Sequence, residues 1–379
     1  MSDAKAPLER CRTDQPQGPT GGRGRGPDEL FAALDLGTNN CRLLVAARTR
    51  EGFRVVDSYS RIVRLGEGLT QTGRLQPAAM ERALEALKIC AERLQRRGSP
   101  RLRAVATQAC RSAENGAEFL ARVTEHTGLS LQIITPREEA RLSVAGCLNL
   151  LDRSAEAALV LDVGGGSTEL SWVELGGGQA SGQGGARGPS MAMPPIRAWL
   201  SVPIGVVSLA ENFPEQRPGQ HDWFRAMVEA VKAPIAAFRH ADPLREVFAA
   251  DRAHLVGTSG AITSLAGLHL GLKRYDRSLV DGLWMTQGDC DATAERLLAL
   301  DPSARAGQPC IGPDRADLVL AGAAILQAVQ ELWPCSRVRV ADRGLREGLL
   351  LSLMAERSGQ RRRSRRRRRG GTAGAAAPA

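Results

Sequence analysis

The sequence predicts an α/β protein with two similar domains and a cleft between them. A strand–loop–strand pattern occurs twice, over residues 33–43 and again over residues 160–170. In each copy an apolar strand ends in Asp, a turn of small and hydroxyl residues follows, and a second apolar strand leaves the turn. Strands also alternate with helical patterns along most of the chain, which is typical of α/β architectures. The repeat therefore predicts two related domains whose loops face each other.

Length and composition agree with a two-domain protein of the reducing cytoplasm. The chain has 379 residues and 43% hydrophobic residues, enough for two ordinary cores. No apolar run approaches the ~20 residues of a membrane span, and the N-terminus shows no apolar signal segment. The eight cysteines are scattered without a C-x-x-C pair, which argues against a zinc site or a disulfide framework. We therefore expect a cytoplasmic protein without membrane contact.

The positive charge is concentrated at the C-terminus. The formal net charge is +10, and eight arginines lie within residues 361–369, which leaves +2 on the remainder. We expect residues 1–28 and the arginine-rich tail 358–379 to be disordered. The tail is either a solvated end or a non-specific tether to polyanions such as RNA, DNA or a long phosphate polymer. Its lack of aromatic residues argues against base stacking.

The first predicted domain covers residues 29–150. Apolar residues at helical spacing after Pro77, and helical patterns further on, predict three helices. Apolar runs bounded by turn residues predict the strands. The expected elements are a hairpin over 30–56, helices over 77–96, 116–127 and 137–150, and strands over 102–107 and 131–134.

The second predicted domain covers residues 151–357. Its first hairpin is interrupted over 176–195 by a glycine-rich insertion of low complexity. The expected strands are 157–163, 196–203, 254–257 and 338–340, and the expected helices are 221–239, 261–272, 289–300 and 316–332. Because strands and helices alternate here as well, this half also predicts an α/β domain.

The first repeated loop is suited to phosphate. A tight turn over Gly37, Thr38 and Asn39 can point several backbone N–H groups into one hollow. Arg42 beyond it offers a planar fork to a phosphate, and Asp35 precedes it. The alternative is a plain hairpin turn in which Asp35 caps local N–H groups.

The second repeated loop carries a stronger signal. Three consecutive glycines allow the backbone to approach a ligand closely, and hydroxyl and carboxylate residues flank them. Carboxylates beside such a loop suit a hydrated Mg²⁺ that bridges phosphates. The residues concerned are Asp162, Gly164, Gly165, Gly166, Ser167, Thr168 and Glu169. The alternative is a glycine-rich turn whose carboxylates are satisfied locally.

A third loop enters a helix at Gly257, Thr258, Ser259 and Gly260. Helix N-terminal amides favour an anion. Ordinary N-capping by Thr258 or Ser259 is the alternative.

Two further segments carry charged candidates. Arg111 follows a predicted strand and is either a phosphate ligand or a surface partner of Glu114. Thr135 is the expected N-cap of the next helix, so Glu138 and Glu139 fall in its first turn, where acids usually complement the helix dipole. A carboxylate at a phosphate cleft could instead orient a water. Adjacent helical residues point about 100° apart, so only one of the two can face the cleft.

Together these segments resemble the exopolyphosphatase / guanosine pentaphosphate phosphohydrolase (Ppx/GppA) family, in its short two-domain form. That family is part of the actin-like superfamily of sugar kinases and Hsp70 ATPases, with ribonuclease H-like domains. The likeness runs from Ala32 to Met354. Its motifs are residues 35–40, 106–111, 135–142, 162–169, 257–260, 310–317 and 341–348. The resemblance implies two actin-like domains with the active site between them.

The resemblance also implies roles for the candidate residues. It implies hydrolysis of a terminal phosphoanhydride by a water that Glu139 positions, with Arg111 on the phosphoryl group. Asp162 and Glu169 would hold Mg²⁺, for which Mn²⁺ is an alternative, and a monovalent cation is a further candidate. The phosphate-binding residues would be Asp35, Gly37, Thr38, Asn39, Arg42, Gly164, Gly165, Gly166, Ser167, Thr168, Gly257, Thr258, Ser259 and Gly260.

The expected activity is processive release of orthophosphate from inorganic polyphosphate. The first alternative is removal of the 5′ γ-phosphate of pppGpp, a reaction of the stringent response. Two alternatives belong to other classes: an ATP-dependent sugar kinase, for which no sugar-reading segment is evident, and a non-catalytic polyphosphate- or RNA-binding protein. A homodimer is expected by family likeness only. The insertion, the arginine tail and Ala261, where relatives suggest Thr, depart from the family pattern.

Overall fold

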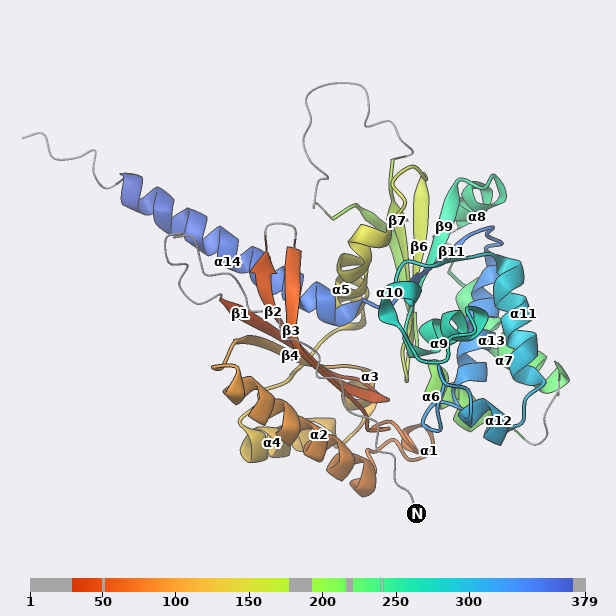
Figure 1. Ribbon diagram of the computed structural model, residues 1–379, viewed down its shortest axis with the longest axis horizontal. Helices are drawn as coiled ribbons and strands as arrows, with labels where there is room; N and C mark the ends of the chain where they lie inside the picture. Colours follow the sequence, from red (N-terminus) through yellow and green to blue (C-terminus); the bar gives the residue numbers. More distant parts are fainter. Residues whose placement is uncertain are drawn as a thin grey trace, which may run out of the picture.

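The computed structural model describes residues 29–370 except 50–51, 177–192, 216–220, 239 and 241, with side chains up to Arg357. The predictions of disorder for residues 1–28 and for 371–379, and most of the 176–195 insertion, lie outside the described residues. Figure 1 shows an α/β protein with two sheets side by side, each covered by helices. Within the described part, no helix combines the length and apolarity needed to cross a bilayer.

The two sheets share one topology, which confirms the predicted fold class. The first has the order β3-β2-β1-β4-β5 and the second the order β10-β11-β9-β6-β7-β8. In each, three antiparallel strands form a meander and the first of them pairs in parallel with a later strand. The strands are β1 (Leu30–Leu36), β2 (Asn40–Thr49), β3 (Gly52–Ile62), β4 (Arg101–Ala106), β5 (Gln132–Ile133), β6 (Ala157–Val163), β7 (Thr168–Glu174), β8 (Ile196–Val202), β9 (Ala253–Thr258), β10 (Trp284–Met285) and β11 (Val338–Ala341). The sequence repeat is therefore a structural duplication.

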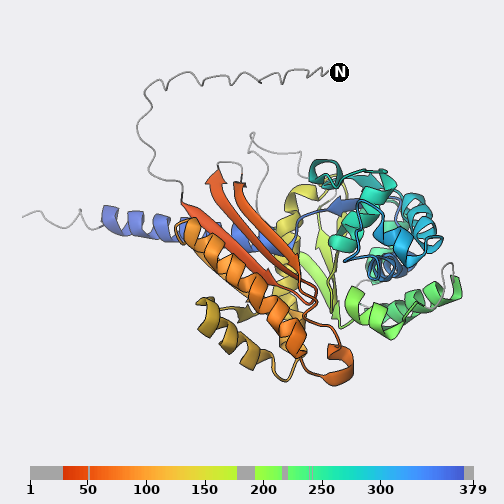
Figure 2. The ribbon, with the colours of Figure 1, turned by 60° about the horizontal axis from the view of Figure 1, so that its bottom comes forward.

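Side-chain alternation along β1 decides which layer each residue joins. Leu34 and Leu36 belong to a core with α2 (Pro77–Arg96) and α4 (Gly116–Thr127), which cover one face of the first sheet (Figure 2). Phe31 and Ala33 point the other way, into a core with α5 (Pro136–Cys147) and α14 (Leu345–Gly370). Since successive strand residues alternate between faces, Asp35 lies on this second face.

The second sheet repeats this arrangement. Leu159, Leu161 and Val163 of β6 face a large core formed with α7 (His221–Ala236), α9 (Gly260–His269) and α13 (Val319–Leu332). Ala158 and Val160 face α5. Asp162 shares their face, so Asp35 and Asp162 project from two different sheets toward the same helix.

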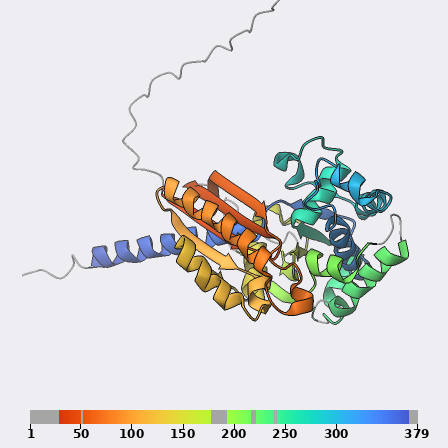
Figure 3. The same cartoon turned by 90° about the horizontal axis from the view of Figure 1, so that it is seen from below.

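Helix α14 corrects the predicted domain limits. The sequence assigned residues up to 357 to the second domain, but Leu349, Leu350 and Leu353 bury against Phe31 and Ala33 of the first sheet. Figure 3 shows α14 extending from the first domain away from the second. Its backbone is helical to Gly370, whereas we expected disorder from residue 358. Arginine is a good helix former, so the run can continue the helix that the buried leucines anchor.

Helices α5 and α14 cross in close contact at the base of the cleft. A Cβ on Gly146 would overlap the Gly344 carbonyl oxygen, and one on Gly348 would overlap the Leu142 carbonyl oxygen. Only glycine allows this approach, because any side chain would push the helices apart. The crossing holds the two sheets at a short separation around α5.

The predicted long elements are present, and most of the short ones were missed. Helices α2 and α4 have the predicted bounds, and α5, α7, α9, α11 and α13 differ by a few residues at their ends. The elements that the sequence did not predict are the long helix α14 and the short elements α1 (Leu69–Thr72), α3 (Gln108–Ser112), α6 (Val206–Asn212), α8 (Asp242–Ala249), α10 (Arg277–Val280), α12 (Pro302–Ala306) and β10. Helix α11 spans Gln287–Leu298. Segments of four to eight residues bury too few side chains to show a clear period.

Candidate active site

A cleft opens between the two sheets and is lined by both repeated loops. The loops face each other at close range: a Cβ on Gly165 would lie 3.0 Å from both the Asn39 nitrogen and the Thr38 Cβ. The predicted residues that line the cleft are Asp35, Gly37, Thr38, Asn39, Arg42, Glu139, Asp162, Gly164, Gly165, Gly166, Ser167, Thr258, Ser259 and Gly260. The structure therefore brings together residues that are more than 200 positions apart in the sequence.

The two loops have the same backbone turn. The Gly37 amide donates to the Asn40 carbonyl at 2.8 Å, and the Gly164 amide donates to the Ser167 carbonyl at 2.9 Å. The strand register then sets Arg42 opposite Asp35 in the first loop. In the second loop it sets Glu169 opposite Asp162.

Asp35 and Asp162 are buried carboxylates that line the cleft next to α5. Burial raises the pKa of Asp35 to about 6, while Arg42 and Arg346 act to lower it and the charge of Asp162 adds to the rise. Burial also raises the pKa of Asp162, against the effect of a hydrogen bond from the Ser143 hydroxyl. The Oδ1 atom of Asp35 is buried and has no hydrogen-bond partner among the described residues. These carboxylates are thus costly to ionise unless a cation joins them.

Glu139 is the member of the glutamate pair that faces the cleft, so the prediction that only one does so is confirmed. Thr135 caps α5 by accepting from the Glu138 amide at 3.2 Å, as predicted. Glu138 points away and binds Arg103. The side chain of Glu139 is buried, and burial raises its pKa well above its usual value, with Glu169 adding to the rise.

Arg111 holds Glu139 from the side of the first domain. Its Nη1 donates to the Glu139 Oε2 at 3.2 Å and to the Ile134 carbonyl at 2.7 Å. The alternative pairing of Arg111 with Glu114 is wrong, because Glu114 binds Arg74 at 3.0 Å. Arg111 is absent from the lining of the cleft and reaches it through Glu139.

Three predicted residues lie behind the lining. Glu169 is buried and accepts from the Ser201 hydroxyl at 2.8 Å; burial, with the charge of Asp162, raises its pKa to about 7. Thr168 donates to the Ile204 carbonyl at 2.7 Å, a structural bond. Gly257 lies within β9. Neither Thr168 nor Gly257 therefore meets the cleft directly.

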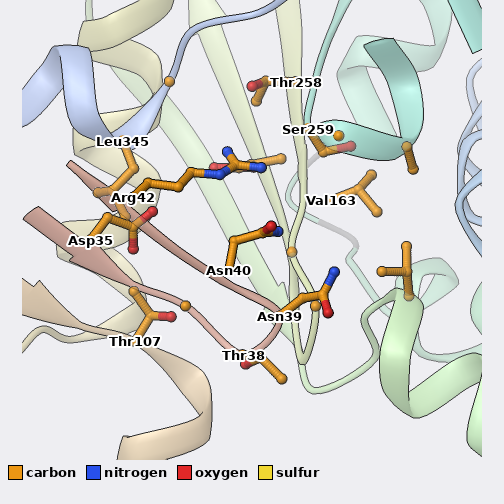
Figure 4. Close-up of a pocket in the computed structure, with 18 of the residues that line it drawn as sticks. Asp35, Thr38, Asn39, Asn40, Arg42, Thr107, Val163, Thr258, Ser259 and Leu345 are labelled. Atoms are coloured by element: carbon orange, nitrogen blue, oxygen red, sulfur yellow. The ribbon is translucent and has the colours of Figure 1, made fainter. Parts of the chain in front are cut away.

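The third loop serves two purposes. Ser259 is the N-cap of α9 and accepts from the Ile262 amide at 3.2 Å, so the capping alternative holds for Ser259. Thr258 and Gly260 line the cleft with it. Figure 4 shows Thr258 and Ser259 across the cleft from Asp35, with Arg42 reaching toward them.

Several cleft residues were missed by sequence reasoning, above all two arginines. A Cβ on Gly260 would lie 3.7 Å from the guanidinium groups of both Arg42 and Arg315, so these two cations from different domains flank one point. Arg346 also lines the cleft, as does Arg343, which is paired with Asp281. Arg315 and Arg346 lie in segments 310–317 and 341–348, which already carried the family resemblance. From the sequence alone, each could also be an ordinary residue at a helix end. The resemblance of those segments was the available signal.

The cleft fits a hydrated divalent cation better than a fully protein-bound one. Among the described residues, no three His, Cys, Asp or Glu side chains are grouped so as to enclose a metal. Mg²⁺ usually takes one or two carboxylates and completes its shell with waters and phosphate oxygens. The unpartnered Asp35 oxygen near the charge of Asp162 provides that limited set.

Comparisons with known proteins agree with this geometry. Exopolyphosphatase 2 of Mycobacterium tuberculosis is 29% identical over 336 residues, which cover 85% of this chain and 98% of that protein. The crystal structure of a Ppx/GppA family member from Aquifex aeolicus matches with a TM-score of 0.68 at 29% identity, over 87% of this chain and 99% of that one. An exopolyphosphatase from Cytophaga hutchinsonii matches with a TM-score of 0.72 over 86% and 98% of the two chains, and at 21% identity it supports the fold alone.

The family comparison covers most of the folded part. The pattern of the Ppx/GppA phosphatase family matches residues 44–357, which include Glu139, the second glycine loop and both missed arginines. The duplicated sheets, the facing loops and this match lead to one conclusion: the chain belongs to the Ppx/GppA phosphatase family.

Proposed function

We propose that this protein is an exopolyphosphatase, which hydrolyses the terminal phosphoanhydride bond of inorganic polyphosphate and releases orthophosphate processively. The observation that carries the proposal is Glu139, a buried carboxylate held by Arg111 at a cleft between two facing glycine loops. The likeness to an exopolyphosphatase over 85% of the chain supports the choice of substrate.

Glu139 is proposed to orient the attacking water. In its ionised form it accepts a proton from the water as the oxygen attacks the terminal phosphorus. The bond from Arg111 to Glu139 fixes the carboxylate in the cleft, and the bond from Arg111 to the Ile134 carbonyl fixes the guanidinium behind it. Phosphoryl transfer needs alignment and charge neutralisation more than covalent help, and this pair offers both.

The loops and the arginines are proposed to bind the phosphates. Backbone amides of the Gly37–Asn39 and Gly164–Ser167 turns would cradle the terminal group. Arg42 and Arg315, which flank Gly260, would neutralise the next phosphates along the chain. A polymer with one charge or more on each unit suits this row of cations.

Asp35 and Asp162 would hold Mg²⁺, with Glu169 behind them. We assign Asp35 to the cation and not directly to phosphate, because an ionised carboxylate repels a phosphate oxygen. When bound, the ion would neutralise charge that develops on the phosphate oxygens. Ser143 and Ser201, by donating to Asp162 and Glu169, keep these carboxylates oriented.

The test is Glu139→Gln, with Glu138→Gln as a matched control on the same helix. We expect Glu139→Gln to reduce phosphate release from long polyphosphate by at least about 100-fold while binding persists, in line with the typical contribution of a general base. Glu138→Gln removes the same charge outside the cleft and is expected to stay near the parent rate.

The assay compares long polyphosphate, tripolyphosphate and pppGpp as substrates for the parent protein. Cleavage of pppGpp in preference to polyphosphate would replace the proposed substrate. Parent-like release by Glu139→Gln would refute the role of this residue. If the parent cleaves none of the three, the protein is not a phosphohydrolase of this kind.

A further inference from the structure

A second cavity lies on the side of α6 opposite the cleft. Val206 lines the cleft, whereas Val207, Ala210 and Glu211 line this cavity of about 320 Å³. Its other walls come from the loop that follows β3 in the first domain and from α7, α12 and α13 of the second. The apolar part of the wall consists of Val207, Ala210, Phe213, Pro214, Trp223, Met227, Pro302, Leu318, Leu320 and Ala321. A cavity of this size with apolar walls is typical of a small-molecule site.

Two polar side chains in this wall carry buried atoms that have no hydrogen-bond partner among the described residues. Arg305 is fully buried, and although its Nη2 donates to Glu215, its Nε and Nη1 have no partner in the described part of the chain. Glu211 accepts from the Gly68 amide at 2.9 Å through Oε1, while its buried Oε2 has no such partner. Unsatisfied buried groups are costly, so the site favours an occupant that presents an acceptor to Arg305 and a donor to Glu211.

The charges around the cavity exclude an anionic occupant. Glu67 is paired with Arg82, and Asp317 is paired with Arg64 at 2.8 Å. Glu215 neutralises Arg305. Glu211 is the lining carboxylate that has no ion pair among the described residues, so an added phosphate or carboxylate would meet net repulsion.

We propose that this cavity binds a purine base or nucleoside that carries no phosphate. A purine combines a flat apolar body, which suits Trp223 and Phe213, with ring acceptors and N–H donors on its edges. In guanine, O6 and N7 accept from a guanidinium, and the N1–H and amino edge can donate to a carboxylate. Arg305 would donate to the acceptor edge and Glu211 would accept from the donor edge.

The cavity walls touch both phosphate loops, so occupancy is expected to reach the cleft. In the first domain, the Gly66 amide donates to the Thr38 carbonyl at 2.9 Å. In the second, the Val207 amide donates to the Gly165 carbonyl at 2.8 Å. A ligand that binds better at one separation of these walls changes the affinity of the cleft for its substrate. Bound substrate in turn changes the affinity for this ligand by the same factor, because the coupling free energy is reciprocal. This coupling step rests on the proposed function; the binding step does not.

The binding test is calorimetric titration of the full chain with guanosine and with adenosine, in the absence of any phosphate substrate. We expect saturable binding of at least one of the two, weakened about tenfold by Glu211→Gln and abolished by Ala210→Phe, which fills the cavity. Glu246→Gln, on the exposed surface of α8, is the matched control and should bind as the parent does. Melting curves of all variants verify folding.

The outcomes separate this inference from the proposed function. Absence of saturable binding of either nucleoside overturns it, whatever the hydrolytic activity, and so does binding that Ala210→Phe leaves intact. Saturable binding that both cavity variants weaken supports it, even if polyphosphate proves not to be the substrate. If polyphosphate is hydrolysed, a nucleoside-dependent change of KM that Ala210→Phe removes supports the coupling. An unchanged KM at saturating nucleoside overturns the coupling alone.

Discussion

The two repeated loops have the same backbone turn, but they differ in the residue that the strand register sets opposite the aspartate. Both close with an amide-to-carbonyl bond of 2.8–2.9 Å, and both place an Asp on the strand before the turn. Opposite Asp35 stands Arg42, whereas opposite Asp162 stands Glu169. The equivalent position therefore carries a cation in the first loop and a carboxylate in the second. Under the proposed function, the first loop would attract phosphate and the second a metal ion.

The two aspartates also differ in their hydrogen bonds and in the charges near them. Asp162 is oriented by the Ser143 hydroxyl on α5. Asp35 keeps an unpartnered buried oxygen and has Arg346 nearby. One carboxylate is thus held by a hydrogen bond, and the other keeps an oxygen that is open to a ligand.

The largest effect is expected from Asp162→Asn. Loss of this carboxylate should lower phosphate release by at least about 100-fold and shift its dependence on Mg²⁺ to higher concentration, because the ion loses its oriented ligand. Rates measured against Mg²⁺ concentration test this. Asp152→Asn is the control, since Asp152 pairs with Arg337 and lies outside the cleft lining. An unchanged Mg²⁺ profile in Asp162→Asn would count against the assignment.

The next largest effect concerns the loops themselves. Gly165→Ala should raise KM by at least about tenfold, because its Cβ would lie 3.0 Å from the facing loop and must push the two hollows apart. Gly37→Ala should do less, since its Cβ would meet only the Asn40 carbonyl of its own turn, at 3.3 Å. Steady-state kinetics on tripolyphosphate compare the two. Equal effects would show that the contact between loops does not control binding.

A similar or smaller effect is expected from Arg42→Gln. It should raise KM for polyphosphate by about tenfold, the value of one charge-assisted hydrogen bond, and leave the Mg²⁺ profile unchanged. Arg96→Gln removes the same charge from the exposed end of α2 and should leave KM unchanged. A shifted Mg²⁺ profile in Arg42→Gln would mean that the two loops do not divide their roles as proposed.

The smallest expected effect is on how the free energy of unfolding depends on pH. The folded-state pKa values of Asp35 (about 6) and Glu169 (about 7) lie above the ordinary carboxyl range. Their contribution to folding is therefore fully present below about pH 4 and is lost as pH rises through 6 to 7, on the order of 2–3 kcal/mol for Asp35. Mg²⁺ needs the ionised forms, so it should raise the melting temperature more at pH 8 than at pH 5.

Melting curves with and without Mg²⁺ at the two pH values test this expectation. Asp35→Asn should flatten the pH dependence of the metal-free protein, because a neutral amide has no charge to bury. Equal stabilisation by Mg²⁺ at both pH values would place the ion away from these carboxylates.

Local patterns predicted the long helices other than α14, and they predicted the key glutamate. The bounds of α2 and α4 were predicted because each buries one regular stripe, and Pro77 marks the start of α2. Glu139 could be singled out with Glu138 because an N-cap fixes which residues fall in the first helical turn. Short helices such as α6, which forms the wall between the two cavities, left no readable period.

Contacts between segments that are far apart in the sequence could not be predicted from the sequence. The partner of Arg111 could be Glu114 by proximity in the chain, and it is Glu139, because α3 and α5 follow the adjacent parallel strands β4 and β5. Arg315 meets Arg42 at Gly260 only because two domains close around one cleft. Helix α14 was not predicted, and nothing in the local sequence tells that its leucines pack on the first sheet.

The sequence by itself determined the duplication, the two glycine turns and the acids beside them, because strand alternation and turn geometry depend on neighbouring residues. Tertiary structure alone decided that both aspartates face α5, that Thr168 and Gly257 stay behind the cleft, and that arginines from both domains meet. These outcomes depend on how two sheets pack around one helix, and packing free energy is a sum over contacts between segments that the chain order does not pair.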